Sequence, residues 1–177
     1  MLLECVIDGE LFQKYCSEAR CNHIREVARS KVDRGEDDYV IKECNCITEL
    51  LEAIGRKKCV LAISEKIRDE YLTYYDKMPR DVIELLGQII SHNDKVHKVD
   101  PEQNPRGLLI KDFQKIESTQ LKNKKIYLDA AKCLNERIIV CTKDELLNIY
   151  KPNSDLLIAC EIHARCVCHQ WDEVKKC

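Results

Sequence analysis

Glycine and proline are scarce in this chain of 177 residues, with only five of the first and four of the second. Their scarcity predicts a globular protein rich in helix. The sequence also lacks any apolar run near the ~20 residues that cross a bilayer, so we expect no membrane partner. An excess of one charge sign is missing too, because the formal net charge is only −2. A nucleic-acid partner would therefore need local basic patches.

The N-terminus lacks the basic and apolar segments of a secretion signal, which predicts an intracellular, cytoplasmic protein. The twelve cysteines are unusual for that setting, where we expect thiols to stay reduced. Many lie within apolar runs, where a thiol packs as a small hydrophobic group. These are Cys5, Cys59, Cys133, Cys141 and Cys160.

Two short motifs, "CNC" (44–46) and "CVCH" (166–169), leave other readings of the cysteines open. Together they could supply thiolates to a zinc or iron–sulfur site, although C-x-C spacing lacks the two-residue gap of common zinc knuckles. Disulfides are the other alternative, with Cys177 as a partner.

Short apolar runs alternate with amphipathic segments along the chain. The runs predict buried strands over residues 2–7, 57–64 and 137–144, with a closing strand at 165–169. We expect helices over residues 11–32, 46–55, 65–75, 79–92, 107–120, 124–136 and 154–163, a turn at 33–38 and a loop over 92–107. The alternation predicts a single three-layer α/β/α domain over residues 1–177, with a mainly parallel central sheet. Residues 160–177 would form its Cys-rich C-terminal strand and tail.

Acidic residues follow the predicted strands. Asp8 and Asp144 each come directly after a buried strand, at the edge where open α/β sheets bind their ligands. Glu70 shares the inward stripe of its helix with Ile67 and Tyr71. A carboxylate on a buried stripe needs a partner, and a divalent cation shared by these acids would supply one.

The segments that carry these acids resemble a known family. They read "CVIDGELF" with Asp8, "LAISEKIRDEY" with Glu70, and "RIIVCTKDELL" with Thr142 and Asp144. In this order they resemble the PIN domain (PilT N-terminus) nucleases, in which a strand ends in Asp, a helix carries Glu, and a later strand precedes Thr-x-Asp. The closing "ARCVCHQWDEV" is similar to the family's final strand and the short acidic turn after it. The ordered set spans nearly the whole chain.

The family pattern also has an acid on a later helix. Asp129 in "YLDAAKCL" is the nearest match, 15 residues before Asp144, where the family leaves about one helical turn more. It falls on the polar face of its helix, so a solvated carboxylate is the alternative. Asp112 has better apolar neighbours but lies too far upstream for the family's spacing.

Carboxylate oxygens suit Mg²⁺ or Mn²⁺. Asp8, Glu70, Asp144 and Asp129 would hold such an ion and form the catalytic centre, and Thr142 would support a ligand carboxylate or a water. The ion would lower the pKa of a bound water and stabilise displacement at phosphorus. The resemblance implies that the chain is a metal-dependent endoribonuclease.

The expected partner is RNA, single-stranded if tyrosines stack on its bases. Basic groups that could hold its backbone are "GRKK" (55–58), "KNKK" (122–125), Arg25, Arg29, Lys31 and Arg34. Such clusters are more often solvated helix ends. A toxin of the toxin–antitoxin kind would also bind an antitoxin protein, whereas a housekeeping RNA-processing nuclease would not. A second copy of the chain is a further partner to test.

Other functions and roles stay open. PIN-like chains can lose activity and persist as RNA- or protein-binding modules, and the departure of Asp129 from the family's spacing fits that alternative. Each predicted ligand also has a simpler structural role. Asp8 or Asp144 would cap the helix that follows it, and Glu70 would pair with an arginine.

Overall fold

Five parallel strands form one central sheet in the computed structural model of the chain, which describes residues 3–15, 26, 35–77, 80–103, 114–116 and 120–176. The strands are β1 (Leu3–Ile7), β2 (Cys59–Ile63), β3 (Val96–Lys98), β4 (Ile138–Cys141) and β5 (His163–Cys166). They lie in the order β3-β2-β1-β4-β5, and every neighbouring pair is parallel. The three predicted apolar strands are therefore confirmed as β1, β2 and β4.

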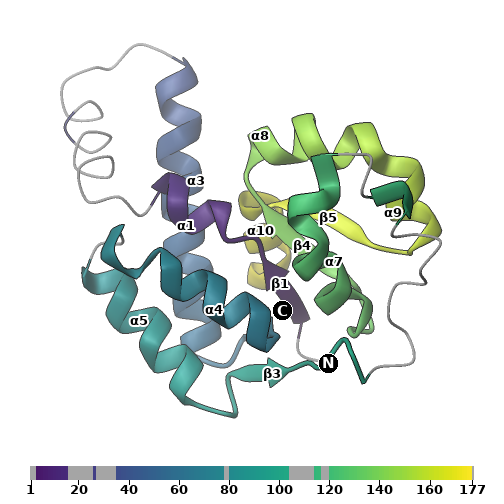
Figure 1. The fold of residues 1–177 in the computed structure, drawn as a ribbon. Coiled ribbons are helices and arrows are strands. Elements are labelled where there is room, and N and C mark those ends of the chain that lie inside the picture. The colour runs from purple at the N-terminus through teal and green to yellow at the C-terminus, as the bar shows by residue number, and fades with distance from the viewer. Residues whose placement is uncertain are drawn as a thin grey trace.

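Helices cover both faces of this sheet (Figure 1). The described helices are α1 (Glu10–Tyr15), α3 (Gly35–Gly55), α4 (Glu65–Thr73), α5 (Arg80–Ser91), α7 (Lys125–Lys132), α8 (Lys143–Glu145), α9 (Ser154–Ala159) and α10 (Val167–Lys176), with the short helical turns η1 (Tyr75–Lys77), η2 (Gln120–Lys124), η3 (Leu146–Tyr150) and η4 (Lys151–Asn153). Helices α3 and α10 pack on one another and on the sheet, and α5 packs on α3. On the other face, α7 lies on β1, β2 and β4 and contacts α4. The predicted three-layer α/β/α domain is confirmed.

The apolar strands that the sequence predicted are the buried ones. Every residue of β4 is buried, as are Val6 and Ile7 of β1, because helices cover both faces of these strands. In the edge strand β3 only Val96 is buried. The prediction of a loop over 92–107 is wrong at β3, since so short an edge strand has no apolar run to mark it.

Two helices differ from the predicted pattern. Helix α3 begins at Gly35, inside the segment 33–38 predicted as a turn, and its packing against α5 and α10 stabilises it. Helix α10 replaces the acidic turn expected after the last strand, and the prediction of strand over 167–169 is wrong, because β5 ends at Cys166. Its buried residues Val167, Gln170 and Val174 follow the spacing of one helix face, so packing on α3 holds this segment helical.

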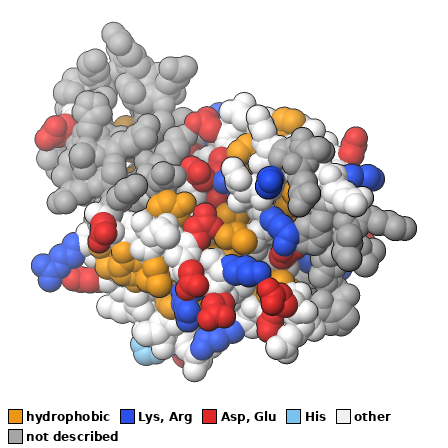
Figure 2. All heavy atoms as spheres, in the orientation of Figure 1, with side chains coloured by type: hydrophobic (Ala, Val, Ile, Leu, Met, Phe, Trp, Pro, Cys, Tyr) orange, Lys and Arg blue, Asp and Glu red, His pale blue; other side chains and the backbone are white. Residues whose placement is uncertain are grey.

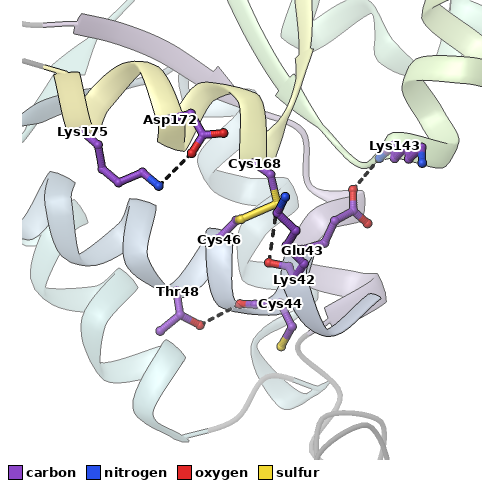
Figure 3. Close-up of a disulfide and its surroundings, with 9 residues drawn as sticks. All are labelled: Lys42, Glu43, Cys44, Cys46, Thr48, Lys143, Cys168, Asp172 and Lys175. Atoms are coloured by element: carbon purple, nitrogen blue, oxygen red, sulfur yellow. Dashed lines mark hydrogen bonds and ion pairs between the residues drawn. A yellow bond between two sulfur atoms is a disulfide. The ribbon is translucent and has the colours of Figure 1, made fainter. Parts of the chain in front are cut away.

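A disulfide between Cys46 of α3 and Cys168 of α10 joins these two helices (Figure 3). It brings together the motifs "CNC" and "CVCH" through one covalent bond. The expectation of reduced thiols is wrong for this pair. Nearby, a Glu43 oxygen accepts a hydrogen bond from the backbone N–H of Lys143 at 2.6 Å, which ties the start of α8 to α3.

Two predicted helices are described only in part. Helix α1 covers the start of the segment predicted over 11–32, and residues 114–116 are helical within the segment predicted over 107–120. Outside the described residues lie Asp112, Cys177, Arg25, Arg29, Lys31 and Arg34. None of the helices in the described ranges combines the length and the apolar character needed to cross a bilayer.

Candidate functional site

The strand order reverses between β1 and β4, which lie side by side in the sheet. Ligands of open α/β sheets bind at the carboxyl ends of the strands at such a point. Asp8 directly follows β1, and its backbone N–H donates to the carbonyl oxygen of Val140 at 2.8 Å. The segment 142–145 follows β4. The predicted acids Asp8 and Asp144 thus come from the two strand ends that meet here.

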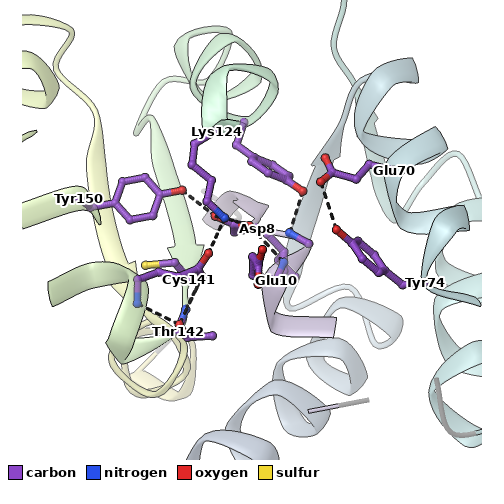
Figure 4. A network of polar contacts seen from close by, with 12 residues as sticks. Asp8, Glu10, Glu70, Tyr74, Lys124, Cys141, Thr142 and Tyr150 are labelled. Carbon is purple, nitrogen blue, oxygen red and sulfur yellow. Dashed lines mark hydrogen bonds and ion pairs between the residues drawn. The ribbon is translucent and has the colours of Figure 1, made fainter. Parts of the chain in front are cut away.

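Asp8 is completely buried, and three donors hold its carboxylate (Figure 4). Lys124 Nζ lies 3.0 Å from each of the two carboxylate oxygens. Tyr150 Oη donates to Oδ2 at 2.7 Å, and the backbone N–H of Glu10 donates to Oδ1 at 3.2 Å. The last bond supports the start of α1, as the capping alternative expects. The other two donors come from distant parts of the chain and satisfy a carboxylate that burial alone would destabilise.

Lys124 is the last residue of η2, and only 6% of its side chain is exposed. Its ammonium group also pairs with Glu145 Oε1, so two carboxylates share one cation. Burial works to lower the pKa of Lys124, but Asp8 and Glu145 outweigh it and raise that pKa to about 12. Lys124 is therefore charged at neutral pH. We call the group of Asp8, Lys124, Glu145 and Tyr150 the Asp8 centre.

A capping box at the start of α8 fixes Glu145. Thr142 Oγ1 accepts from the backbone N–H of Glu145 at 3.1 Å, and Glu145 Oε2 accepts from the backbone N–H of Thr142 at 3.2 Å. Burial, followed by the charge of Asp8, raises the pKa of Glu145 to about 7. Asp144 lies between these two residues and is exposed. The N-cap of α8 is Thr142, not Asp144.

Glu70 reaches the same strand end from α4. It lies beside the buried residues of that helix, and its Oε1 accepts from Tyr74 Oη at 3.3 Å. Burial and the charge of Glu70 raise the pKa of Tyr74 to about 12, so this phenol stays a donor. A Cβ built on Gly9, the residue after Asp8, would lie 3.8 Å from Glu70 Cδ. Figure 4 shows Glu70 and Lys124 on opposite sides of this turn.

Asp129 lies on α7 and lines a separate cavity of about 590 Å³ beside α4. Its Oδ2 accepts from Lys125 Nζ at 3.0 Å, and only 15% of its side chain is exposed. Burial raises the pKa of Asp129 above its ordinary value, and Lys125 opposes that effect. Asp129 is therefore not the solvated surface carboxylate of the alternative reading.

The four acids predicted to bind one metal ion are not gathered into one group. Among the described residues, no set of three or more His, Cys, Asp or Glu side chains is placed to hold a metal ion. The position of a cation between Asp8 and Glu145 is taken by the ammonium group of Lys124. In this arrangement the residues do not fit a divalent ion.

Lys124, Glu145 and Tyr150 are members of the Asp8 centre that were not among the predicted site residues. The spacing Thr142-x-x-Glu145 before an apolar run was the signal for Glu145, because it is the spacing of a capping box. Tyr150 carried no such signal, since it reaches Asp8 across 142 residues of chain. Lys124 was expected at the surface with the rest of "KNKK", and that expectation is wrong.

Comparisons with known proteins identify no relative, since no family model, curated protein or solved structure matches the chain. The resemblance to the PIN domain nucleases therefore stays a prediction. It rests on the order of short motifs in the sequence, and the fold rests on the structure.

Proposed function

We propose that this chain is a PIN-like module that binds single-stranded RNA at the carboxyl edge of its sheet without hydrolysing it. The observation that carries the proposal is the ammonium group of Lys124, which pairs with both Asp8 and Glu145. It neutralises charge where the resemblance expects a metal ion. An ammonium group has only N–H donors, so it cannot coordinate a water and lower its pKa as a metal ion does.

Side chains suited to an RNA strand lie at the carboxyl edge of the sheet. Lys66 at the start of α4, Lys98 at the end of β3, and Lys122 are exposed. Tyr74 is half-buried and offers a ring for stacking. Acidic side chains are mixed with basic ones on the face shown in Figure 2. We therefore expect modest affinity that falls as salt is raised.

The test measures binding and cleavage of a labelled single-stranded RNA with Mg²⁺, with Mn²⁺ and with a chelator. The proposal expects retention of intact RNA under all three conditions. Cleavage that needs Mn²⁺ and is lost in Asp8→Asn would overturn it. Absence of RNA binding at low salt would remove the RNA part of the proposal.

Metal-dependent endoribonuclease activity with Mg²⁺ or Mn²⁺ is the second candidate. It is favoured by one observation, that Asp8 and Glu70 approach the turn at Gly9 from two different elements. Lys124 would have to leave Asp8 before a metal ion could bind there. Asp144→Asn would then abolish cleavage, whereas the binding module would keep its RNA affinity.

Lys124→Ala removes one partner of a buried ion pair and leaves uncompensated charge, so we expect the free energy of unfolding to fall by about 3–5 kcal/mol. Mn²⁺ should then raise the melting temperature of this variant, because Asp8 and Glu145 have lost their cation. Mn²⁺ should leave the wild type unchanged. Thermal melts with and without MnCl₂ measure both effects.

Lys122→Ala is the matched control, because it removes an exposed lysine two residues away. We expect it to melt within about 0.5 kcal/mol of the wild type, with no response to Mn²⁺. A wild-type melting temperature that rises with Mn²⁺ as much as that of Lys124→Ala would contradict the role given to Lys124.

A further inference from the structure

The cavity beside Asp129 lies at the same edge of the sheet as the Asp8 centre but is not part of it. It opens at the carboxyl ends of β2 and β3, and side chains of α4 and α7 line it. Its volume of about 590 Å³ is within the range of small-molecule sites. Lys66 and Lys98 of the proposed RNA surface lie on its lining, but the proposed function gives no role to its interior or to Asp129.

The walls of the cavity combine an apolar floor with a charged rim. Ile63, Val96 and Val99 are core residues that also line the cavity. The part of the lining that they form is apolar, and a flat ring can pack against it. At the rim, Lys66 Nζ lies 2.6 Å from Glu102 Oε1, and these side chains are 65% and 75% exposed. An ion pair this exposed contributes little to stability, so a ligand anion can replace Glu102 beside Lys66.

Asp129 supplies the feature that selects a ligand. Its Oδ1 is buried and has no hydrogen-bond partner in the described part of the chain, while Oδ2 is paired with Lys125. A buried acceptor without a donor destabilises the protein, and a ligand N–H would remove that cost. The carboxylate has lone pairs for two N–H donors side by side, because Oδ2 accepts only one bond from Lys125.

We propose that this cavity binds a guanine nucleotide, with the base on the apolar floor, its N–H groups donated to Asp129, and its phosphate beside Lys66. Guanine is the common base whose edge presents two neighbouring N–H donors, at N1 and N2, and a carboxylate accepts such a pair in bidentate fashion. Adenine and cytosine offer one amino group next to a ring acceptor. Uracil offers one N–H between two carbonyl oxygens, which the carboxylate repels.

The guanine nucleotide has two sources, the free nucleotide and a guanosine within RNA. Only the second source rests on the proposed function. Binding of GMP, IMP, AMP and guanosine to the purified full chain is measured by calorimetry. We expect GMP to bind best, and IMP, which lacks the N2 amino group, to bind about tenfold more weakly. Guanosine should also bind more weakly than GMP, and this difference should vanish in Lys66→Gln.

Asp129→Asn keeps the shape of the side chain but replaces one acceptor oxygen by a donor, so GMP affinity should fall at least about tenfold. Asp155→Asn, the same change at an exposed position on α9, should bind GMP as the wild type does. Equal GMP affinity in wild type and Asp129→Asn, or no nucleotide binding at millimolar concentration, would overturn the inference. Should Asp129→Asn fail to fold, the comparison of GMP with IMP on the wild type decides the question.

Competition separates the two sources and the two proposals. Displacement of GMP by a guanosine-containing RNA strand, but not by a guanosine-free one, assigns the cavity to RNA. GMP binding without any RNA binding keeps the inference and removes the proposed function. RNA binding that is unchanged in Asp129→Asn, with no GMP bound, keeps the proposed function and removes the inference.

Discussion

At the scale of single residues, Lys124 and its two acids set the charge of the buried centre. With Glu145 ionised, one ammonium group faces two carboxylates, and the three groups carry one net negative charge. With Glu145 protonated they are neutral. Burial favours the neutral state, which is why the pKa of Glu145 rises to about 7 while Lys124 stays charged.

This balance predicts how stability depends on pH. The pKa of Glu145 is about 7 in the folded chain, against an ordinary value of 4.5. Between these values the folded state holds a proton that the unfolded state has released, so unfolding releases it. The free energy of unfolding should therefore fall as pH rises from about 4.5 to 7, by up to about 3 kcal/mol from this group.

Urea denaturation across that pH range, on wild type and Glu145→Gln, isolates the contribution of Glu145. The variant cannot titrate at this position, so the free energy of unfolding of the wild type minus that of the variant should fall steadily from pH 4.5 to 7 and be flat outside that window. A constant difference at every pH would contradict the shifted pKa.

Single residues also show what the sequence could reveal of the site. Asp8 was found because a carboxylate directly after a buried strand stands out in a linear pattern. Lys124 could not be found in this way, because a lysine is buried only when partners distant in sequence surround it. Asp129 was identified as a candidate acid, but the cavity that it lines depends on how β2, β3, α4 and α7 come together.

At the scale of elements, the turn between β1 and α1 depends on close packing around Gly9. The backbone N–H of Gly9 donates to Tyr127 Oη of α7 at 2.9 Å. A Cβ at this position would lie 2.6 Å from Tyr127 Oη and 3.0 Å from Tyr74 Cε2. A strand end and side chains from two helical regions therefore meet where only glycine fits.

Gly9→Ala should lower the free energy of unfolding by about 1–3 kcal/mol, because the methyl group forces these side chains apart. Gly87→Ala is the control. A Cβ at Gly87 in α5 would lie 3.5 Å from Tyr75 Oη, an ordinary contact, so helix propensity should stabilise that variant by up to about 1 kcal/mol. Urea denaturation measures both changes. Equal stability of the two variants would show that the turn tolerates a side chain.

Buried strands could be predicted from the sequence, whereas the edge strand β3 and the last helix could not. β1, β2 and β4 could be predicted because both their faces are buried and their residues form continuous apolar runs. The edge strand β3 could not, since it is held by pairing with β2 rather than by apolar residues of its own. The helical state of α10 depends on its packing against α3, a contact between segments far apart in sequence.

At the scale of the whole molecule, one edge of the sheet carries both candidate sites. The Asp8 centre lies where β1 and β4 end, and the cavity at Asp129 lies where β2 and β3 end. This follows from the all-parallel sheet, which places every carboxyl end at the same edge. Helices α3 and α10 pack on the face of the sheet away from α7, and the disulfide joins these two helices.

The disulfide should stabilise the molecule as a whole. Cys46 and Cys168 are 122 residues apart, and closing so long a loop restricts the unfolded chain. We expect reduction to lower the free energy of unfolding by about 2–4 kcal/mol. Urea denaturation with and without dithiothreitol measures this effect. The double variant Cys46→Ala, Cys168→Ala should match the reduced protein and ignore the reductant, and a wild type that also ignores it would contradict the prediction.

The same bond makes residues 46–168 a covalently closed ring. The strands β2, β3, β4 and β5 belong to this ring, whereas β1, which lies between β2 and β4, enters from outside it. In an oxidised unfolded chain, β2 and β4 therefore remain joined both by the polypeptide between them and through the disulfide, whereas β1 lies outside the closed loop. The disulfide thus limits how far β2 and β4 can separate, and β1 can leave or rejoin the sheet without opening the ring.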